Sequence, residues 1–380
     1  MNSSIVQKNI DQAVKILEAN IHQFGSRFWE NSSKNNRYQL TKHADWTEGY
    51  ITGCYWLAWE ETGRDIFKDT ALQQVDAFLE RITVRDFVDH HDMGVLFSPS
   101  CVAAYKLTKD ETAKKAALMA ADNLLNRFQE KGQFFQAWGD YGARDNYRMI
   151  IDGLNNLPIL YWASEVTGDS KYREKAIAHT ETALKVLFRP DWSSYHTFFF
   201  DPETGEPDRG VTAQGYRSDT PWARGQAWGI YGVALNYRYT QNPRSLEIFK
   251  HIADFFMDHL PSSGVPYWDF SFPDGSNEPW DSSASAIAAC GMLEMTRYLP
   301  LDDAEKYKAS ACKLLDALTE KCAVKDISEA NGLLMHGVYG KSSPYNTVPD
   351  DGVDECNCWG DYYYLEALTR LKNPNWVVYW

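Results

Sequence analysis

The chain has 380 residues, of which 44% are hydrophobic and 24% are charged, and its formal net charge is −14. Length and composition indicate a globular protein with one large core or two ordinary ones. The negative charge and the lack of a basic run exclude nucleic acid as a partner, because phosphate binding needs clustered Lys and Arg. No apolar run approaches the roughly 20 residues that span a bilayer, so we expect no membrane association.

Residues 1–20 form a charged amphipathic pattern without the apolar core of a signal peptide. The seven cysteines are odd in number and mostly embedded in apolar helical patterns, as expected for free thiols in a reducing compartment. We therefore expect a cytoplasmic protein.

Helical periodicity runs along the chain and alternates between two kinds of segment, with six of each. One kind is rich in aromatic and small residues and suited to burial on every side: 47–61, 94–108, 151–167, 223–240, 281–299 and 359–371. The other kind is charged on one face: 4–24, 65–82, 110–129, 170–187, 244–260 and 302–322.

The connections between these segments are very short at one end and long at the other. The long ones are 83–93, 130–149, 188–221, 261–280 and 323–358. Short turns imply antiparallel neighbours, and inner helices that are apolar all round need an outer ring. We therefore predict an all-α (α/α)6 barrel, a six-hairpin toroid, as a single domain over 1–380 rather than an open solenoid. Its functional site is expected at the long-loop end.

Two carboxylates stand at the start of inner segments, Asp92 in "HHDMG" and Asp152 in "IIDGLNN". An Asp at such a position often caps its helix, which is the alternative to a catalytic role. For Asp152 this alternative is weaker, because Met149, Ile150 and Ile151 precede it. Apolar surroundings raise an Asp pKa from about 3.9 toward the range useful for acid catalysis. Asp92 and Asp152 are therefore the candidate catalytic residues.

Other polar residues gather in the same loops. The run "HHD" at 90–92 is not a metal motif, since adjacent residues seldom reach one ion, and we expect neither a metal nor a cofactor. His196, in the run "YHTFFF", is either an interior hydrogen-bonded histidine or a ligand contact. Gln214 and Arg224 are better ligand candidates, because a guanidinium matches a substrate carboxylate with two parallel hydrogen bonds. Arg217 is a second candidate for that role.

Nine ordered motifs between about residue 38 and residue 371 resemble those of the unsaturated glucuronyl hydrolases, glycoside hydrolase family 88. They include "DWTEGY", "HHDMG", "RMIIDGLNNLPILYWASEVTGD", "SSYHTFFFDPETGE" and "RGQAWGIYGVALNYRY". The resemblance implies an (α/α)6 barrel acting on oligosaccharides that polysaccharide lyases produce. Such an enzyme removes a non-reducing-end uronate that carries a C4=C5 double bond.

The resemblance also implies residue roles. Asp152 matches the family's general acid and base, and Asp92 matches its partner. The positions that match the lining of the sugar site are Trp46, His91, Trp138, His196, Gln214, Arg224 and Trp228. The implied reaction is a hydration in which Asp152 protonates C4 and water attacks C5, so no protein nucleophile is required.

The loop after "HGVY" departs from the family pattern. Members of the streptococcal type carry Ser-x-x-Ser-x-Lys there, a combination suited to sulfate. Here the three positions become Gly340, Ser343 and Tyr345, while Lys341 offers a cation in a shifted register and an acidic run follows at 350–354. We name Ser343 as a further substrate contact and expect unsulfated unsaturated disaccharides to be accepted at least as well as sulfated ones.

Three alternatives to this function remain open. An unsaturated rhamnogalacturonyl hydrolase shares the barrel and the mechanism but accepts a different sugar after the cleaved bond. A sugar epimerase of the same barrel type needs catalytic histidines and leaves the double bond untouched. A non-catalytic helical scaffold turns over no sugar, and it does not explain the aromatic and charged residues in the long loops.

Overall fold

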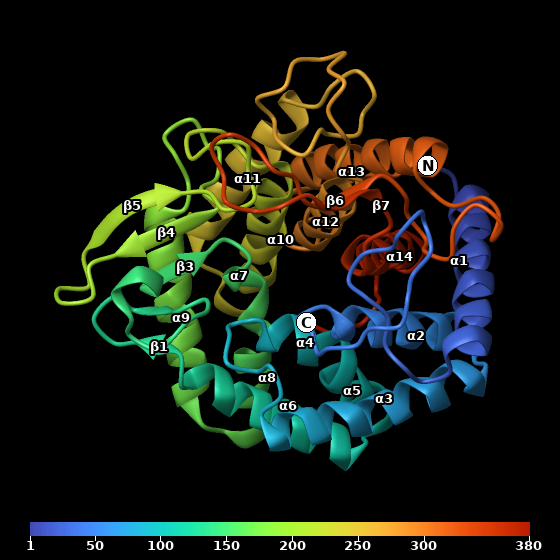
Figure 1. Ribbon diagram of the computed structural model, residues 1–380, viewed down its shortest axis with the longest axis horizontal. Helices are drawn as coiled ribbons and strands as arrows, with labels where there is room; N and C mark the ends of the chain where they lie inside the picture. Colours follow the sequence, from blue (N-terminus) through green and yellow to red (C-terminus); the bar gives the residue numbers. More distant parts are fainter.

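The computed structural model describes residues 1–380 and contains an inner and an outer ring of helices (Figure 1). The inner ring consists of α2 (Glu48–Thr62), α4 with α5 (Met93–Phe97 and Ala103–Thr108), α7 with α8 (Gly153–Asn156 and Pro158–Thr167), α10 (Ala223–Thr240), α12 (Ser282–Met295) and α14 (Cys358–Lys372). The outer ring consists of α1 (Ser3–Phe24), α3 (Asp65–Val84), α6 (Glu111–Leu125), α9 (Ser170–Val186), α11 (Pro243–Asp258) and α13 (Leu301–Lys321). This alternation confirms the predicted (α/α)6 barrel.

The ring closes through its last helix. Helix α14 packs against both α12 and α2, and α1 packs against α14. Every residue of α12 is buried, whereas the outer helix α11 buries one face that includes Ile248, Ile252 and Phe256. The contrast follows the sequence pattern, in which inner segments are apolar all round and outer ones are amphipathic. One cluster of 106 buried residues joins the two rings.

Two predicted inner helices are interrupted, which corrects the expectation of continuous helices over 94–108 and 151–167. Between α4 and α5 the chain forms a π-helical turn at Ser98–Val102, which contains Pro99. Pro158 starts α8 directly after α7 ends. Proline has no N–H to donate and crowds the preceding turn, so it breaks the regular ladder.

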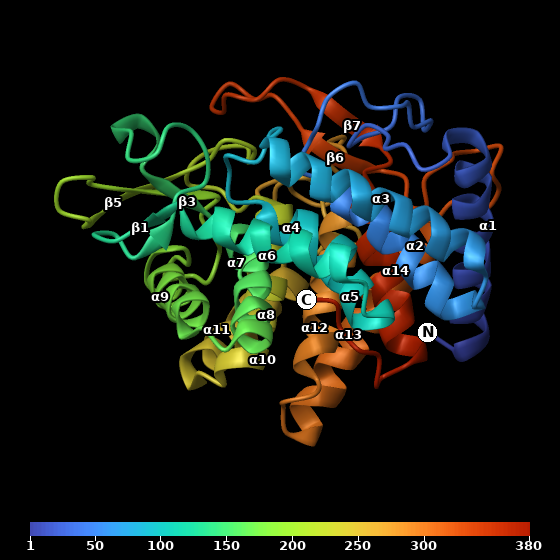
Figure 2. The ribbon, with the colours of Figure 1, turned by 90° about the horizontal axis from the view of Figure 1, so that it is seen from below.

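Three small antiparallel sheets lie within the long loops. They pair β1 (Phe128–Gln129) with β2 (Phe134–Phe135), β4 (Thr197–Phe200) with both β3 (Arg148–Ile150) and β5 (Pro207–Val211), and β6 (Gly337–Gly340) with β7 (Asp351–Glu355). Because Phe128–Gln129 form a strand, the outer helix predicted to reach residue 129 ends at Leu125. Figure 2 shows the sheets and long loops together at one end of the barrel. The pairing of β3 with β4 aligns Ile150 with Thr197, so Asp152 and His196 emerge side by side.

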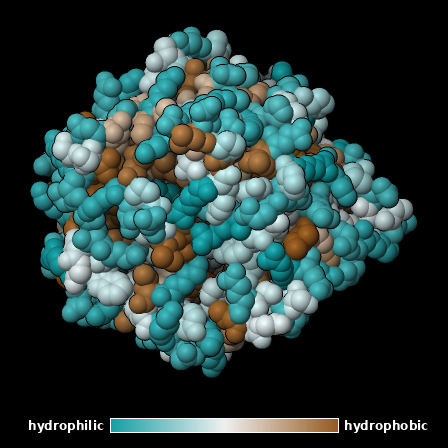
Figure 3. All heavy atoms as spheres, turned by 180° about the vertical axis from the view of Figure 1, so that it is seen from behind, coloured by the Kyte–Doolittle hydropathy of each residue, from teal (hydrophilic) through white to brown (hydrophobic).

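The opposite end of the barrel is covered by the final residues of the chain. After α14 the chain turns back into the ring, where Val378, Tyr379 and Trp380 are buried (Figure 1). Trp380 donates from Nε1 to Glu366 at 2.9 Å. Seen from behind, the surface is mostly hydrophilic with small hydrophobic patches (Figure 3). None of the helices combines the length and apolarity needed to cross a membrane.

Candidate active site

A cavity of about 590 Å³ opens among the long loops, where the inner helices begin. This volume is typical of a site for a small ligand. Its lining includes most of the residues singled out from the sequence: Trp46, Asp92, Trp138, Asp152, His196, Gln214, Arg224 and Trp228. Residues far apart in the chain therefore meet at the end of the barrel that the loop lengths indicated.

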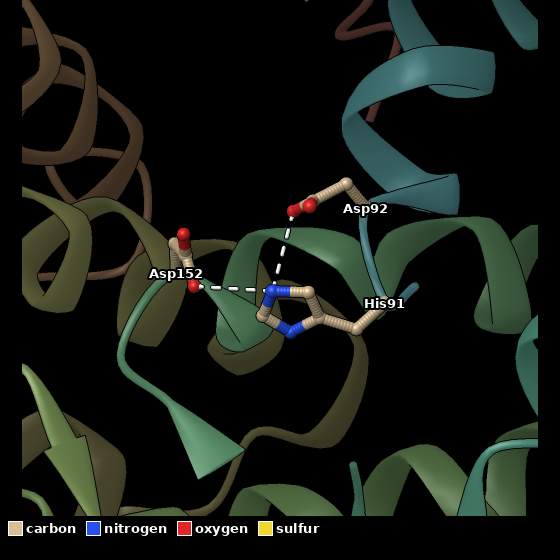
Figure 4. A group of neighbouring side chains, drawn as sticks. All are labelled: His91, Asp92 and Asp152. Carbon is tan, nitrogen blue, oxygen red and sulfur yellow. Dashed lines mark ion pairs between the residues drawn. The ribbon is translucent and has the colours of Figure 1, made fainter. Parts of the chain in front are cut away.

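Asp92 and Asp152 both approach the same ring nitrogen of His91 (Figure 4). His91 Nε2 is 3.4 Å from Asp92 Oδ1 and 3.6 Å from Asp152 Oδ1, and the three groups come within 4.8 Å of one another. Neither carboxylate caps its helix, so the capping alternative has no support. The three groups are also of the types that bind divalent cations, so the expectation of no metal stays a prediction.

The surroundings of Asp152 favour its neutral form. Strand β3 leads into it through the buried residues Met149, Ile150 and Ile151. Its side chain keeps 24% exposure toward the cavity, while Oδ1 has no hydrogen-bond partner. Burial, together with the nearby charge of Asp92, raises the pKa of Asp152 well above its ordinary value. The raised pKa favours the protonated form of Asp152 and is compatible with the predicted role as an acid.

The pKa of Asp92 is shifted in the opposite direction. Burial opposes its ionisation, but the neighbouring His91 and His90 outweigh burial and lower the pKa of Asp92. His90 Nδ1 lies 3.1 Å from Asp92 Oδ2, and Asn156 Nδ2 donates to Asp92 Oδ1 at 3.3 Å. The site thus holds two neighbouring carboxyls whose pKa values are shifted in opposite directions.

Two residues that hold Asp92 were not identified from the sequence, namely His90 and Asn156. Asn156 reaches Asp92 because α4 and α7 approach closely at Gly94, where a Cβ would lie 2.3 Å from Asn156 Cα. A sequence signal existed for each. Asn156 follows Asp152 by one helical turn, and His90 belongs to the run "HHD".

Arg224 lines the cavity but is already bound to the protein. Its Nη1 donates to Asp281 at 2.7 Å and to the carbonyl of Val338, and Nη2 donates to the carbonyl of Tyr339 at 2.7 Å. These contacts use three of its five N–H donors. Arg224 therefore ties β6 to the start of α12 in addition to any contact with a ligand.

His196 and two tryptophans form much of the cavity wall. His196 Nδ1 accepts the N–H of Ala213 at 3.1 Å, and burial lowers the pKa of His196 to about 3, so its ring is neutral. Trp46 is held by stacking on Trp359 at 5.3 Å, whereas Trp138 is 46% exposed. Aromatic faces of this kind suit the apolar faces of sugar rings.

Two predicted contact residues do not line the cavity. His91 is buried behind the carboxylates. The Ser343 hydroxyl donates to the carbonyl of Tyr216 at 2.7 Å and accepts the N–H groups of Tyr345 and Asn346. Ser343 as a substrate contact stays a prediction, and its hydroxyl is already bonded to Tyr216, Tyr345 and Asn346.

The cations proposed for anion binding nearby are also paired within the protein. Lys341 Nζ lies 3.0 Å from Asp350, and Ser342 donates to the same carboxylate from its N–H and its hydroxyl at 2.7 Å each. These three donors lower the pKa of Asp350 to about 2. Arg217 pairs with Asp219 at 2.7 Å and lies outside the cavity lining.

A closed (α/α)6 barrel with two coupled carboxyls in a cavity defines a carbohydrate-active enzyme of the glycosidase class. The family model described as Glycosyl Hydrolase Family 88 matches residues 20–372. The unsaturated chondroitin disaccharide hydrolase of Streptococcus pyogenes serotype M1 is 46% identical over 377 residues, covering 99% of this chain and 93% of that protein. The chain therefore belongs to glycoside hydrolase family 88, as its motifs suggested.

Solved structures agree with this assignment. An unsaturated glucuronyl hydrolase from Streptococcus agalactiae is 44% identical with a TM-score of 0.96, covering 100% of this chain and 94% of that chain. The unsaturated glucuronyl hydrolase from Bacillus sp. GL1, described as responsible for glycosaminoglycan degradation, is 42% identical with a TM-score of 0.93 and 99% coverage of each chain. The resemblance drawn from the sequence is confirmed.

Proposed function

We propose that this enzyme removes 4,5-unsaturated glucuronic acid from the non-reducing end of lyase-generated oligosaccharides of the glycosaminoglycan or gellan type. The observation that carries the proposal is the pair of adjacent carboxyls at one cavity, with the pKa of Asp152 raised and the pKa of Asp92 lowered. The names of the relatives support a glucuronyl substrate over the rhamnogalacturonyl alternative.

The proposed reaction needs only one proton donor. The C4=C5 bond is a vinyl ether, so a proton moving from Asp152 to C4 leaves positive charge shared between C5 and the ring oxygen. Water adds to C5 and gives its proton to the Asp152 carboxylate, which restores the acid. The resulting hemiketal opens to a ketone at C5, and the hemiacetal left at C1 releases the rest of the oligosaccharide.

Asp92 contributes to this cycle through its negative charge. Its negative charge favours the protonated form of Asp152 before the reaction, since two adjacent carboxylates repel each other. The same charge stabilises the cation that develops at C5. His91 lies between the two acids and interacts with both.

Recognition of the uronate carboxylate is assigned to Gln214, His196 and Arg224, with Trp46, Trp138 and Trp228 as walls for the sugar rings. Arg224 keeps two N–H donors beyond its three protein contacts. A charge-assisted hydrogen bond from this guanidinium suits the uronate carboxylate.

Unsulfated disaccharides are the expected substrates. Asp350 takes up the donors of Lys341 and Ser342, and the hairpin presents Gly340, Val348, Pro349 and Asp351 to the cavity. Neither an apolar pair nor a carboxylate attracts a sulfate. We propose that unsulfated unsaturated chondroitin disaccharide is turned over at least as well as its 6-sulfated form.

The test compares unsaturated chondroitin, gellan-type and rhamnogalacturonan-type substrates by the loss of ultraviolet absorbance of the double bond. Absorbance should fall with the glucuronyl substrates and stay constant with the rhamnogalacturonyl one. Asp152→Asn should lose about 10²–10⁴-fold in kcat while staying folded, because an amide cannot deliver the proton. Asp76→Asn, on an exposed part of α3, is the matched control. Near-normal turnover by Asp152→Asn would move the acid elsewhere.

Two further features accord with expectations from the sequence. The single core shared by both rings supports one catalytic domain over residues 1–380. All seven cysteines are free thiols, which supports a cytoplasmic location. The proposed partner is the oligosaccharide substrate alone.

A further inference from the structure

His179 lies on the outer helix α9, away from the cavity, yet it is completely buried. Its Nδ1 accepts the backbone N–H of Phe135 at 2.9 Å. Burial lowers the pKa of His179 to about 3, so the ring is neutral and carries one proton. Because Nδ1 is an acceptor, that proton resides on Nε2.

The protonated nitrogen of His179 and Nδ1 of His91 border the same space beside Gly153. A Cβ on Gly153 would lie 3.3 Å from His179 Nε2 and 3.4 Å from His91 Nδ1. Both nitrogens are buried and neither has a hydrogen-bond partner. Gly153 follows Asp152 directly, so its missing side chain leaves the two imidazoles as neighbours behind the catalytic acid.

The opposite nitrogen of His91 faces the carboxyls, at 3.4 Å from Asp92 and 3.6 Å from Asp152. Burial lowers the pKa of His91 to about 4, so this ring also carries one proton at neutral pH. With the proton on Nε2, His91 donates between the two acids. With the proton on Nδ1 instead, the lone pair of His91 Nε2 would face the charged Asp92. The Nδ1–H of His91 would then face the Nε2–H of His179.

We propose that His179 is a positioning residue for the catalytic pair. Its Nε2–H, oriented by the backbone amide of Phe135, directs a donor toward His91 Nδ1 and thereby sets His91 as the Nε2–H tautomer. His91 then donates to the charged Asp92 and keeps the proton of the pair on Asp152. This inference rests on the proposed catalytic roles of Asp92 and Asp152.

Two substitutions of His179 separate this role from simple packing. His179→Asn keeps an acceptor near the Nδ1 position, and so keeps the contact with Phe135, but it lacks the donor. His179→Gln places an amide N–H near the Nε2 position but loses the acceptor. If His179 positions His91, the Asn variant should lose about 10-fold or more in kcat with little change in KM, and the Gln variant should retain more activity. If His179 only supports Phe135, the order of the two variants reverses, which would overturn the proposal.

The tautomer itself can be observed without any substrate. Nitrogen-15 spectra of histidine-labelled protein at pH 7 should show His91 protonated at Nε2, with the signal assigned by its loss in His91→Gln. In His179→Asn the proton should redistribute between the two nitrogens. An unchanged His91 tautomer in this variant would refute the link even if the enzyme proves to act on another sugar.

Gly153→Ala gives an independent test if His179→Asn fails to fold. The new methyl group would stand between His179 Nε2 and His91 Nδ1 while both rings remain. We expect the same redistribution of the His91 proton. Retention of the Nε2–H tautomer and of wild-type kcat in Gly153→Ala would overturn the proposal.

Discussion

Asp92 and Asp152 have the same side chain, but their pKa values are shifted in opposite directions because their immediate neighbours differ. Asp92 receives a hydrogen bond from Asn156 and lies beside His90 and His91, whereas Asp152 follows buried apolar residues and has an unpartnered Oδ1. Hydrogen bonds to a carboxylate favour ionisation, and burial without them opposes it. The division of roles between acid and charged partner therefore originates in single contacts.

This division predicts the pH dependence of kcat/KM. The rate should fall as pH drops through the lowered pKa of Asp92, and it should fall as pH rises through the raised pKa of Asp152. Asp92→Asn removes the charge that raises the Asp152 pKa, so the alkaline limb of its residual activity should move to lower pH. A pH profile of kcat/KM for both proteins measures this. An unmoved alkaline limb would mean that Asp92 does not tune Asp152.

Arg224 is expected to affect stability as well as binding. Arg224→Ala leaves the buried Asp281 without its partner, and losing one member of a buried pair costs about 3–5 kcal/mol. Arg224→Lys keeps a positive charge beside Asp281 but loses the planar fork, so it should stay folded and raise KM about 10-fold. Urea unfolding and steady-state kinetics separate the two effects. An unchanged KM in Arg224→Lys would exclude Arg224 from carboxylate binding.

At the scale of elements, the β6–β7 hairpin lines part of the cavity and also carries polar side chains at its tip. Its strands carry Tyr339 and Asp351 to the cavity, while its tip directs Lys341 and Ser342 toward Asp350. The donors of Lys341 and Ser342 are therefore already bonded to Asp350, a carboxylate of the same hairpin. We therefore expect the hairpin to be the element that determines tolerance of sulfate.

Replacing the internal carboxylate should change that tolerance. Asp350→Asn removes the charge that holds Lys341, so the ratio of kcat/KM for 6-sulfated over unsulfated unsaturated chondroitin disaccharide should rise. Because exposed ion pairs are worth about 0.2–1 kcal/mol, the expected rise is about twofold to fivefold. Adding Lys341→Ala to this variant should cancel it. No change in the ratio would show that the hairpin tip does not face the sulfate.

At the scale of the whole molecule, the inner ring of helices is closed, and the end of the barrel opposite the cavity is filled. Contact of α14 with α2 completes the inner ring, and the final residues fill its lower end. The Trp380 ring lies parallel to Tyr363 at 6.1 Å, and Tyr363 in turn contacts Trp228 of the cavity wall. The end of the chain thus packs against an aromatic residue that contacts the cavity wall.

Trp380 should therefore be important for stability. Trp380→Ala is expected to lower the free energy of unfolding by about 3–5 kcal/mol, because a large buried ring is lost. Trp380→Phe keeps an aromatic ring but leaves Glu366 without the indole donor, for a smaller loss of about 1–3 kcal/mol. Urea denaturation measures both values. A loss below 1 kcal/mol in Trp380→Ala would mean that the segment is dispensable.

Local patterns along the chain were sufficient to predict the architecture and the end of the barrel that carries the site. Apolar residues at helical spacing distinguish inner from outer helices, and loop length distinguishes the two ends, because both patterns belong to single segments. The apolar neighbours of Asp152 likewise distinguish it from an ordinary capping residue, since they adjoin it in the chain. Motif resemblance supplied the remaining candidates, including Trp46, Trp138 and Trp228.

Which donors and acceptors are already occupied follows from the folded molecule alone. The fold pairs Arg224 with Asp281 across 57 positions and Ser343 with Tyr216 across 127. It also brings Asn156 to Asp92 and His179 to His91, where glycines let backbones and rings approach. Such contacts depend on distances between elements, and no residue pattern within one element encodes those distances.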